Sequence, residues 1–354
     1  MNIRTLLNSA YLSTVLIGCG AQVETSAPPS EHPNMDCAAW SPDGRFKIWT
    51  SRVGDSYLGF RFDNGTNRSA RPFGSESGFS GVGGERRCVV DEMGTVAYQG
   101  VEHGVSAVFV EDVYGNKTTI PHADHPDLNR FGRLVYTQYT STAESGVFLN
   151  NFPFSSAPQR LTVMPRASHP LISGDGNVAA FMVEGAFGSR IYRYDISSGR
   201  YESISPMRPG FVSDQDSLLS ISYDGAVLLF ASSFPVLPED HNQQVDLYTY
   251  DDTTRSYTRV TVNSHGNEIA NPELDLSQVG MSGNGRYVAW VSSSYEFDSS
   301  IVGNAIFVQD LERGITRKVR DGSAFWGIQY SGNSFLFSEP DSFSPSALSL
   351  ARFF

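Results

Sequence analysis

The sequence predicts an all-β protein: a β-propeller of about seven four-stranded blades, with six as the alternative count, preceded by a signal peptide and a flexible tether. Three observations lead to this prediction. One unit, consisting of an apolar strand, a turn with Gly and a second apolar strand, recurs along the chain. A second hairpin follows the first in most units. No stretch keeps a helical spacing of apolar residues over three turns, which excludes an αβ repeat.

The recurring unit is clearest where Asp-Gly or Asn-Gly separates two apolar runs. This dipeptide supplies the positive φ of a tight hairpin turn, so each copy is expected to join two antiparallel strands. Successive turn glycines lie 50, 38, 44, 49 and 60 residues apart, close to the ~40 to 50 residues of a propeller blade. A seventh, looser copy lies at residues 330–333. The six turn glycines are Gly44, Gly94, Gly132, Gly176, Gly225 and Gly285.

The second hairpin of each unit is marked by an aromatic-rich strand that ends at an Asp. We expect this Asp to accept backbone N–H bonds in the turn that follows it, and two hairpins then make a four-stranded sheet. A β-sandwich would also show frequent turns, but not this ordered pair of hairpins. The residues concerned are Asp63, Asp112, Asp195, Asp251 and Asp310.

Residues 1–18 are predicted to be an export signal. Arg4 is followed by a mostly apolar stretch over residues 5–18, shorter than the ~20 residues that a membrane-spanning helix needs. The stretch ends in Leu-Ile-Gly-Cys at residues 16–19, which resembles the lipobox of bacterial lipoproteins. That resemblance implies that Cys19 is acylated and becomes the N-terminus. The alternatives are an ordinary export signal with an incidental cysteine, and a buried apolar strand.

Residues 19–34 are predicted to be a flexible tether, because they are rich in Ala, Ser, Pro and Glu. Gly20 stands where Asp would favour the inner membrane, so resemblance to Gram-negative lipoproteins implies the outer membrane. Residues 35–354 contain no other segment of membrane-spanning length, and we expect a soluble, monomeric propeller held at the cell envelope by its lipid anchor alone. Its last unit has a predicted third strand at residues 348–353 but no fourth, and residues 22–26 are the candidate to pair with that edge.

The body of the chain resembles the TolB-like, or PD40 (WD40-like), propeller family. Its hallmark turn, Trp-Ser-Pro-Asp-Gly-Arg, is found at residues 40–45, and the resemblance covers most of residues 35–354. Residues 246–251 and 282–290 are also similar to an exported subgroup of that family. TolB itself has an α/β domain ahead of its propeller, whereas this chain has a tether there. TolB's envelope partners are therefore not carried over.

The composition argues against nucleic acid as a partner. Lys and Arg number 26 against 38 Asp and Glu, without a basic cluster, so the chain would repel a phosphate backbone. Charged residues make up 18% of the chain, below the roughly 25% of an average globular protein. Abundant Ser, Gly, Thr and Tyr favour strands and tight turns.

Few residues suggest catalysis. Gly-Phe-Ser-Gly-Val at residues 78–82 lacks the last Gly of a hydrolase nucleophile elbow, and no residues remain for a hydrolase domain. The string His-Ala-Asp-His at residues 122–125 contains metal-ligand types beside two prolines, and fits either a metal or catalytic site or a solvated loop. His103 and His169 are isolated in the sequence, and we expect loop and strand-packing roles for them. The paired carboxylates at residues 251–252 fit turns better than a glycosidase.

One loop has the residue spacing of a calcium site. Side chains with oxygen atoms occur at every second position, as at the start of a Ca²⁺ loop, although the Gly and distal Glu of an EF-hand are absent. The alternative is a polar connection between two strands, and no other cofactor is expected. The candidate ligands are Asp240, Asn242, Gln244 and Asp246.

Cys37 and Cys88 are a candidate disulfide. They lie seven and six residues before Gly44 and Gly94, on the first strands of adjacent units. Opposite parity points one side chain toward the next blade and the other toward the previous blade. Export to an oxidising compartment, with Cys19 acylated, leaves an even pair. The alternative is two small buried residues.

These features predict a non-catalytic binding or scaffolding module for an envelope protein or a glycan, using blade loops and the channel mouth. The alternative function is a polysaccharide-active enzyme of lyase type, with His and Tyr at the channel mouth. A convergent cluster of His, Tyr and Arg would favour the enzyme, and scattered polar residues around a shallow funnel would favour binding.

Overall fold

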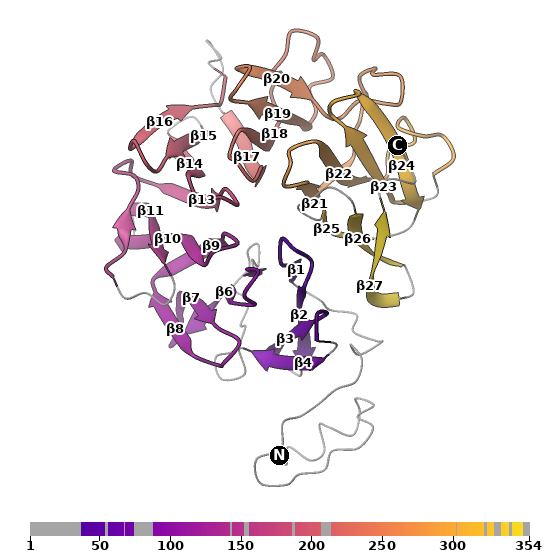
Figure 1. Ribbon diagram of the computed structural model, residues 1–354. Helices are drawn as coiled ribbons and strands as arrows, with labels where there is room; N and C mark the ends of the chain where they lie inside the picture. The colour runs from indigo at the N-terminus through magenta and orange to yellow at the C-terminus, as the bar shows by residue number, and fades with distance from the viewer. Residues whose placement is uncertain are drawn as a thin grey trace.

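A computed structural model gives the fold of the chain (Figure 1). The structure describes residues 37–349, except 54–55, 67, 74–87, 142–143, 152–155, 186–187, 207–213, 302, 322–323, 329–333 and 340–341. The predicted signal peptide, Cys19 and the tether lie outside these residues, and so do residues 78–82. No helix in the described part of the chain is long and apolar enough to cross a membrane.

The described residues form six four-stranded antiparallel blades and a seventh sheet of three strands, and a short parallel pairing of the third strand of blade 4 with the first strand of blade 5 joins these two blades into one eight-stranded sheet. Blades 1 to 3 contain β1 (Ala38–Trp40), β2 (Phe46–Val53), β3 (Ser56–Asp63), β4 (Arg68–Phe73), β5 (Cys88–Val90), β6 (Val96–Glu102), β7 (Val105–Glu111), β8 (Lys117–Pro121), β9 (Ala123–Leu128), β10 (Arg133–Ser141), β11 (Glu144–Asn151) and β12 (Gln159–Arg160). Blades 4 to 6 contain β13 (Ala167–Ile172), β14 (Val178–Gly185), β15 (Gly188–Asp195), β16 (Arg200–Ser203), β17 (Asp214–Ile221), β18 (Val227–Ser232), β19 (Asp246–Asp251), β20 (Ser256–Arg259), β21 (Leu274–Met281), β22 (Tyr287–Ser292), β23 (Ala305–Asp310) and β24 (Ile315–Asp321).

The sheets form a ring, with the first strand of each sheet nearest the centre (Figure 1). The seventh sheet consists of β25 (Ala324–Ile328), β26 (Ser334–Glu339) and β27 (Ser342–Ser349). Its first strand contacts both β21 and β1, so this sheet lies between blade 6 and blade 1. The predicted propeller is confirmed. The third strand of the last sheet begins at Ser342 rather than at residue 348, and the predicted pairing of residues 22–26 lies outside the described residues.

The predicted turns form for the expected physical reasons. In blade 1, Ser41 Oγ accepts the Phe46 N–H at 2.8 Å and donates to Asp43 at 2.5 Å, while Gly44 has a φ of 74°. Ser173, Ser222 and Ser282 make the same bonds in blades 4, 5 and 6. In blades 1, 2, 4, 5 and 6 an Asp at the end of the third strand, or directly after it, accepts a backbone N–H from its turn, as predicted for Asp63, Asp112, Asp195, Asp251 and Asp310.

The hydrophobic core lies between neighbouring blades. Between blades 1 and 2, for example, Phe46, Phe73, Tyr98 and Phe109 are almost completely buried and pack together. Near this cluster, Cys37 and Cys88 are joined as a disulfide with a Cα–Cα distance of 6.0 Å, within the usual range for such a bond. The disulfide therefore links the residue just before β1 to the first residue of β5, in the adjacent blade.

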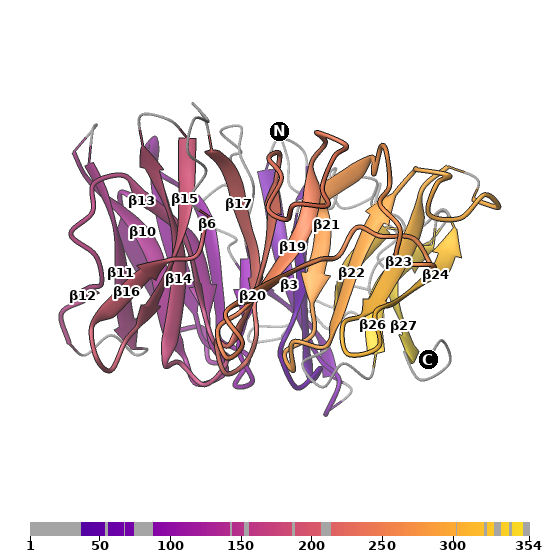
Figure 2. The same ribbon diagram turned by 90° about the horizontal axis from the view of Figure 1, so that it is seen from above.

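The meander within each blade gives the propeller two different faces (Figure 2). The turns joining the first strand to the second, and the third to the fourth, lie on one face, which we call the hairpin face. The links between second and third strands, and between successive blades, lie on the other, which we call the loop face. Longer polar segments, such as residues 233–245 and 260–273, belong to the loop face.

Candidate functional site

The innermost strands of blades 3 and 4 carry a β-bulge near the loop face, and the innermost strands β17, β21 and β25 shift register against their second strands as well. In β9 the pairing with β10 steps over His125 and Pro126, and in β13 the pairing with β14 steps over His169 and Pro170. Each His-Pro dipeptide therefore forms a β-bulge. Such bulges redirect side chains and occur often next to functional sites.

Both histidines also have a strained backbone. The φ angles of His125 and His169 are 48° and 52°, in the left-handed region, which costs a non-glycine residue about 1–3 kcal/mol. A residue before proline ordinarily adopts an extended conformation, so the same strain in two adjacent blades is unexpected. Strain of this kind concentrates at functional sites, because surrounding contacts must maintain it.

The two bulges bring the imidazole rings of His125 and His169 into contact. The ring centroids are 3.7 Å apart, with a 43° angle between the planes. His125 Nδ1 lies 2.6 Å from Asp124 Oδ1, and His169 Nδ1 lies 2.9 Å from Ser168 Oγ. The side chains of His125 and Asp124 are 13% and 10% exposed, so this pair is largely shielded from water.

Tyr139 extends this cluster to blade 3's second strand. Its hydroxyl donates to Asp124 Oδ2 at 2.5 Å, so the Asp124 carboxylate receives a bond on each oxygen. Burial and the neighbouring Asp124 carboxylate raise the pKa of Tyr139, which keeps its hydroxyl protonated. Tyr139 is nevertheless 41% exposed, so its ring is accessible to a ligand. We call His125, His169, Asp124 and Tyr139 the imidazole cluster.

This geometry defines what the imidazole cluster can do chemically. When His125 donates from Nδ1 to the Asp124 carboxylate, its Nε2 is left as a hydrogen-bond acceptor. An acceptor oriented in this way can bind a ligand hydroxyl or act as a general base. The rings of Tyr139 and His169 add apolar faces on which a ligand can stack.

The opposite end of the channel is narrowed by side chains from the hairpin face. Arg130 of blade 3 lies 2.9 Å from Glu92 of blade 2, and its Nη1 donates to the Tyr223 hydroxyl of blade 5 at 3.3 Å. The Tyr223 N–H donates in turn to the carbonyl of Gly283, in blade 6, at 2.6 Å. These contacts link the first hairpins of blades 2, 3, 5 and 6 on the hairpin face.

The predicted calcium loop joins β18 to β19, and its oxygens face internal donors. Asp240 accepts a bond from Tyr248, and Asp246 accepts one from Thr261. The side-chain amide of Asn242 donates to Asp246 at 2.9 Å, and the Gln244 N–H donates to Asn242 Oδ1 at 2.8 Å. The side-chain oxygens of this loop thus accept hydrogen bonds from donors within the protein, and the calcium site stays a prediction.

A buried arginine completes this polar loop. Arg259, whose side chain is 7% exposed, has Nη1 2.6 Å from Glu268 and 3.7 Å from Asp240. A guanidinium therefore already lies where the loop's carboxylates gather. Among the residues that the structure describes, no group of three or more His, Cys, Asp or Glu side chains is placed to hold a metal ion.

The sequence singled out residues 122–125 as either a metal or catalytic site or a solvated loop, and it did not connect them with His169. Asp124 and His125 lie on a strand rather than in a solvated loop, whereas His122 is exposed and precedes β9. His169, which is isolated in the sequence, contacts His125 across the blade boundary. The available signal was the repeated His-Pro dipeptide at the same position of two first strands.

No protein-family model and no curated protein matches this sequence. Solved structures do match its fold. Hydrazine synthase of Kuenenia stuttgartiensis is 14% identical, with a TM-score of 0.58 over 94% of this chain and 98% of that one. Oligogalacturonate lyase of Vibrio parahaemolyticus is 12% identical, with a TM-score of 0.58 over 90% and 89%. TolB of Acinetobacter baumannii is 13% identical, with a TM-score of 0.48 over 79% of this chain and 65% of that one.

At these identities the comparisons show the fold alone. The protein is a β-propeller, a class that includes binding proteins and enzymes. The function of a propeller depends on the side chains of its site and not on its fold. The distinguishing feature is the imidazole cluster on the first strands of blades 3 and 4.

Proposed function

We propose that this protein is an exported, lipid-anchored β-propeller that binds a glycan or an envelope protein at the loop face of its channel, without catalysing a reaction. The observation that supports a ligand site at this face is the convergence of His125 and His169 from two adjacent blades, which the enzyme alternative discussed below shares. Both oxygens of Asp124 are occupied by Tyr139 and His125. Such mutual hydrogen bonds hold the cluster rigid, which favours recognition because little side-chain freedom is lost on binding.

The chemistry of the cluster favours a ligand rich in hydroxyl groups. His125 Nε2 accepts a hydroxyl proton, and the exposed ring of Tyr139 offers a flat face for a sugar ring. The net charge of −12 disfavours polyanions such as nucleic acid. A neutral glycan therefore fits the site best, and a protein loop with serine or threonine hydroxyls is the other source of this chemistry.

The location of the protein is part of the proposal. The order of basic residue, apolar stretch and lipobox-like residues supports export and acylation at Cys19. Gly20 supports the outer membrane, where a tether of residues 19–34 would leave the loop face accessible. A monomer held by its anchor alone is the simplest arrangement.

The binding proposal is tested with a soluble body spanning residues 32–354. A glycan array and an envelope pull-down identify ligands. His125→Ala is expected to weaken the binding of the tightest of these ligands at least tenfold. His265→Ala is the matched control, because His265 is exposed in the loop between β20 and β21. Equal binding by wild type and His125→Ala, with unchanged thermal unfolding, would contradict the proposed site.

A second candidate function is a polysaccharide lyase at the same cluster. It is favoured by the Asp124–His125 pair, which orients Nε2 as a base, and by the protonated Tyr139, which can act as an acid. In this reaction His125 would remove the proton next to a uronate carboxylate, and Tyr139 would protonate the departing glycosidic oxygen, leaving a carbon–carbon double bond. Ultraviolet absorbance of that double bond, lost in His125→Ala, distinguishes this function from binding alone.

A further inference from the structure

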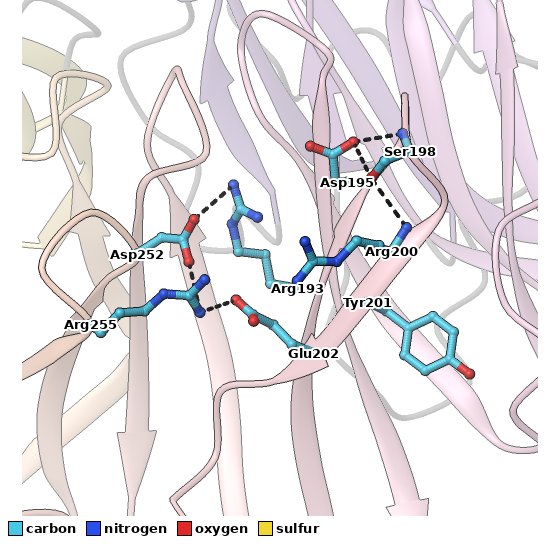
Figure 3. Close-up of a pocket in the computed structure, with 8 residues that line it drawn as sticks. All are labelled: Arg193, Asp195, Ser198, Arg200, Tyr201, Glu202, Asp252 and Arg255. Carbon is cyan, nitrogen blue, oxygen red and sulfur yellow. Dashed lines mark hydrogen bonds and ion pairs between the residues drawn. The ribbon is translucent and has the colours of Figure 1, made fainter.

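A second concave site lies on the hairpin face, between the outer strands of blades 4 and 5 (Figure 3). It is a cavity of about 240 Å³, far from the imidazole cluster in the fold because it is built from the opposite ends of the strands. Its walls are strongly charged, with three arginines and three carboxylates. The lining residues are Arg193, Asp195, Ser198, Arg200, Tyr201, Glu202, Asp252 and Arg255.

Two of the arginines and two of the carboxylates neutralise one another across the blade boundary. Arg193 Nη2 lies 3.3 Å from Asp252, and its Nε donates to the Gly225 carbonyl at 3.1 Å. Arg255 Nη1 lies 2.5 Å from Glu202 and 3.3 Å from Asp252. These four side chains fix the shape of the cavity and leave no net charge on its inner wall.

The two remaining charges belong to Asp195 and Arg200, and no ion pair joins either side chain to another described residue. The hydrogen bonds to the Asp195 side chain all fall on Oδ1, from the Ser197 hydroxyl at 2.7 Å, the Ser198 N–H at 2.8 Å and the Ser198 hydroxyl at 2.9 Å. The backbone N–H of Arg200 donates to the Ser198 hydroxyl at 3.4 Å. Its exposed guanidinium points toward Arg193, whereas Tyr201 points away (Figure 3).

Asp195 is held in its charged form. Hydrogen bonds from the Ser198 N–H and the Ser197 hydroxyl lower its pKa to about 2, so it is a carboxylate at any physiological pH. An arginine is likewise always protonated. The cavity therefore presents one permanent anion and one permanent cation that are not paired with each other.

We propose that this cavity binds a small zwitterion, an α-amino acid, with the ligand carboxylate at Arg200 and the ligand ammonium at Asp195. A simple anion bound at Arg200 would be repelled by Asp195, and a simple cation bound at Asp195 would be repelled by Arg200, because the other two guanidiniums are neutralised by Asp252 and Glu202. A guanidinium binds a carboxylate through two parallel hydrogen bonds, and a carboxylate with an open oxygen accepts from an ammonium group. Only a ligand with both charges satisfies both groups, and the small volume limits its size.

The ligand series tests the two halves of the proposal. Isothermal titration of the soluble body with L-alanine and L-serine is expected to show saturable one-to-one binding. N-acetylalanine, which lacks the ammonium group, and alaninamide, which lacks the carboxylate, are expected to bind at least tenfold more weakly. Absence of saturable binding of either amino acid, or equal binding of alaninamide or N-acetylalanine, would overturn the proposal.

Two variants with matched controls assign the contacts. Arg200→Gln is expected to weaken the binding of L-alanine at least tenfold while leaving the affinity for alaninamide unchanged. Asp195→Asn is expected to weaken the binding of L-alanine while leaving the affinity for N-acetylalanine unchanged. The controls are Arg317→Gln, at an exposed arginine on β24, and Asp112→Asn, in the corresponding hairpin of blade 2. Thermal unfolding of each variant verifies its fold. Wild-type affinity in either cavity variant, or weakened binding in the controls, would place the ligand elsewhere.

Discussion

Asp91 occupies the turn position where blades 1, 4, 5 and 6 have serine. Its Oδ1 accepts the N–H groups of Met93 at 2.9 Å and Thr95 at 2.7 Å, so it closes the turn as serine does. Unlike serine, it brings a negative charge to a fully buried position. Burial raises the pKa of Asp91 to about 6, because its charged form is poorly solvated there. In blade 3, Asn129 accepts the two corresponding backbone N–H groups with its Oδ1 and brings no charge to the turn.

We predict that Asp91→Asn stabilises the protein at neutral pH. A carboxyl whose pKa rises from 3.8 to about 6 on folding contributes stability that is complete below pH 3.8 and is lost as the pH rises through 6. At pH 7 that loss is at most about 3 kcal/mol, and the variant avoids it. Urea unfolding from about pH 4 to about pH 7 should show a smaller fall in the free energy of unfolding for Asp91→Asn than for wild type.

Asp112→Asn is the control with the opposite sign. Although burial opposes it, hydrogen bonds from the side chain and N–H of Asn116 lower the pKa of Asp112. That carboxylate therefore stabilises the fold above its unfolded pKa, and the stability is lost as the pH falls through its folded pKa. Its removal should destabilise the protein at neutral pH. The same direction of change in both variants would refute this account of Asp91.

At the level of the hairpin, Gly94 meets two requirements at once. Its φ is +81°, and a Cβ atom there would lie 2.7 Å from Val113 and 2.8 Å from Phe46 of the neighbouring blade. Gly104, in the next turn, has a φ of +80° with no atom near its missing Cβ. Alanine substitutions at these two glycines therefore separate the cost of backbone strain from the cost of steric overlap.

We predict that Gly94→Ala costs about 2–5 kcal/mol of unfolding free energy and that Gly104→Ala costs only about 1–2 kcal/mol. Both variants place alanine at positive φ, but only the first forces Val113 and Phe46 apart. Thermal and urea unfolding measure the difference. Equal losses would show that the space between blades 1 and 2 adapts to an extra methyl group.

The elements that the sequence predicted well are those encoded within a few residues. Ser41, Asp43 and Gly44 form their turn by bonds to one another and to the next strand, so a short pattern is sufficient to recognise it. The contact of His125 with His169 depends on two bulges and on the angle between blades. Neither is visible in a pattern of single strands. For the same reason, the donors that face the side-chain oxygens of the loop at residues 233–245 could not be predicted.

At the scale of the whole molecule, the proposed anchor decides where the protein is found. We predict that Cys19→Ser releases the protein from membranes into soluble fractions, because a bilayer holds several acyl chains far more strongly than one. Fractionation of cells with detection by antibody measures this change, and mass spectrometry identifies the mature N-terminus. An unmodified N-terminus beyond Cys19 would contradict the lipoprotein proposal.

The disulfide between Cys37 and Cys88 closes a loop that contains the whole of blade 1, with a sequence separation of 51 between the two cysteines. We predict that the unreduced mature protein has no free thiol at these positions. By constraining the unfolded chain, a cross-link over such a loop stabilises the fold by up to about 4 kcal/mol. Reductant should therefore lower the unfolding midpoint of the wild type.

The double variant Cys37→Ser, Cys88→Ser shows whether that shift comes from this bond. It should not respond to reductant, because it has no disulfide at this place to reduce, and it should unfold at the midpoint of the reduced wild type. We expect it to fold, because buried side chains pack between the other blades. A single serine at either position leaves one reactive thiol, which labelling of the unfolded protein detects. Two labelled thiols in the unreduced wild type would show that the pair is not oxidised and that blades 1 and 2 are joined by packing alone.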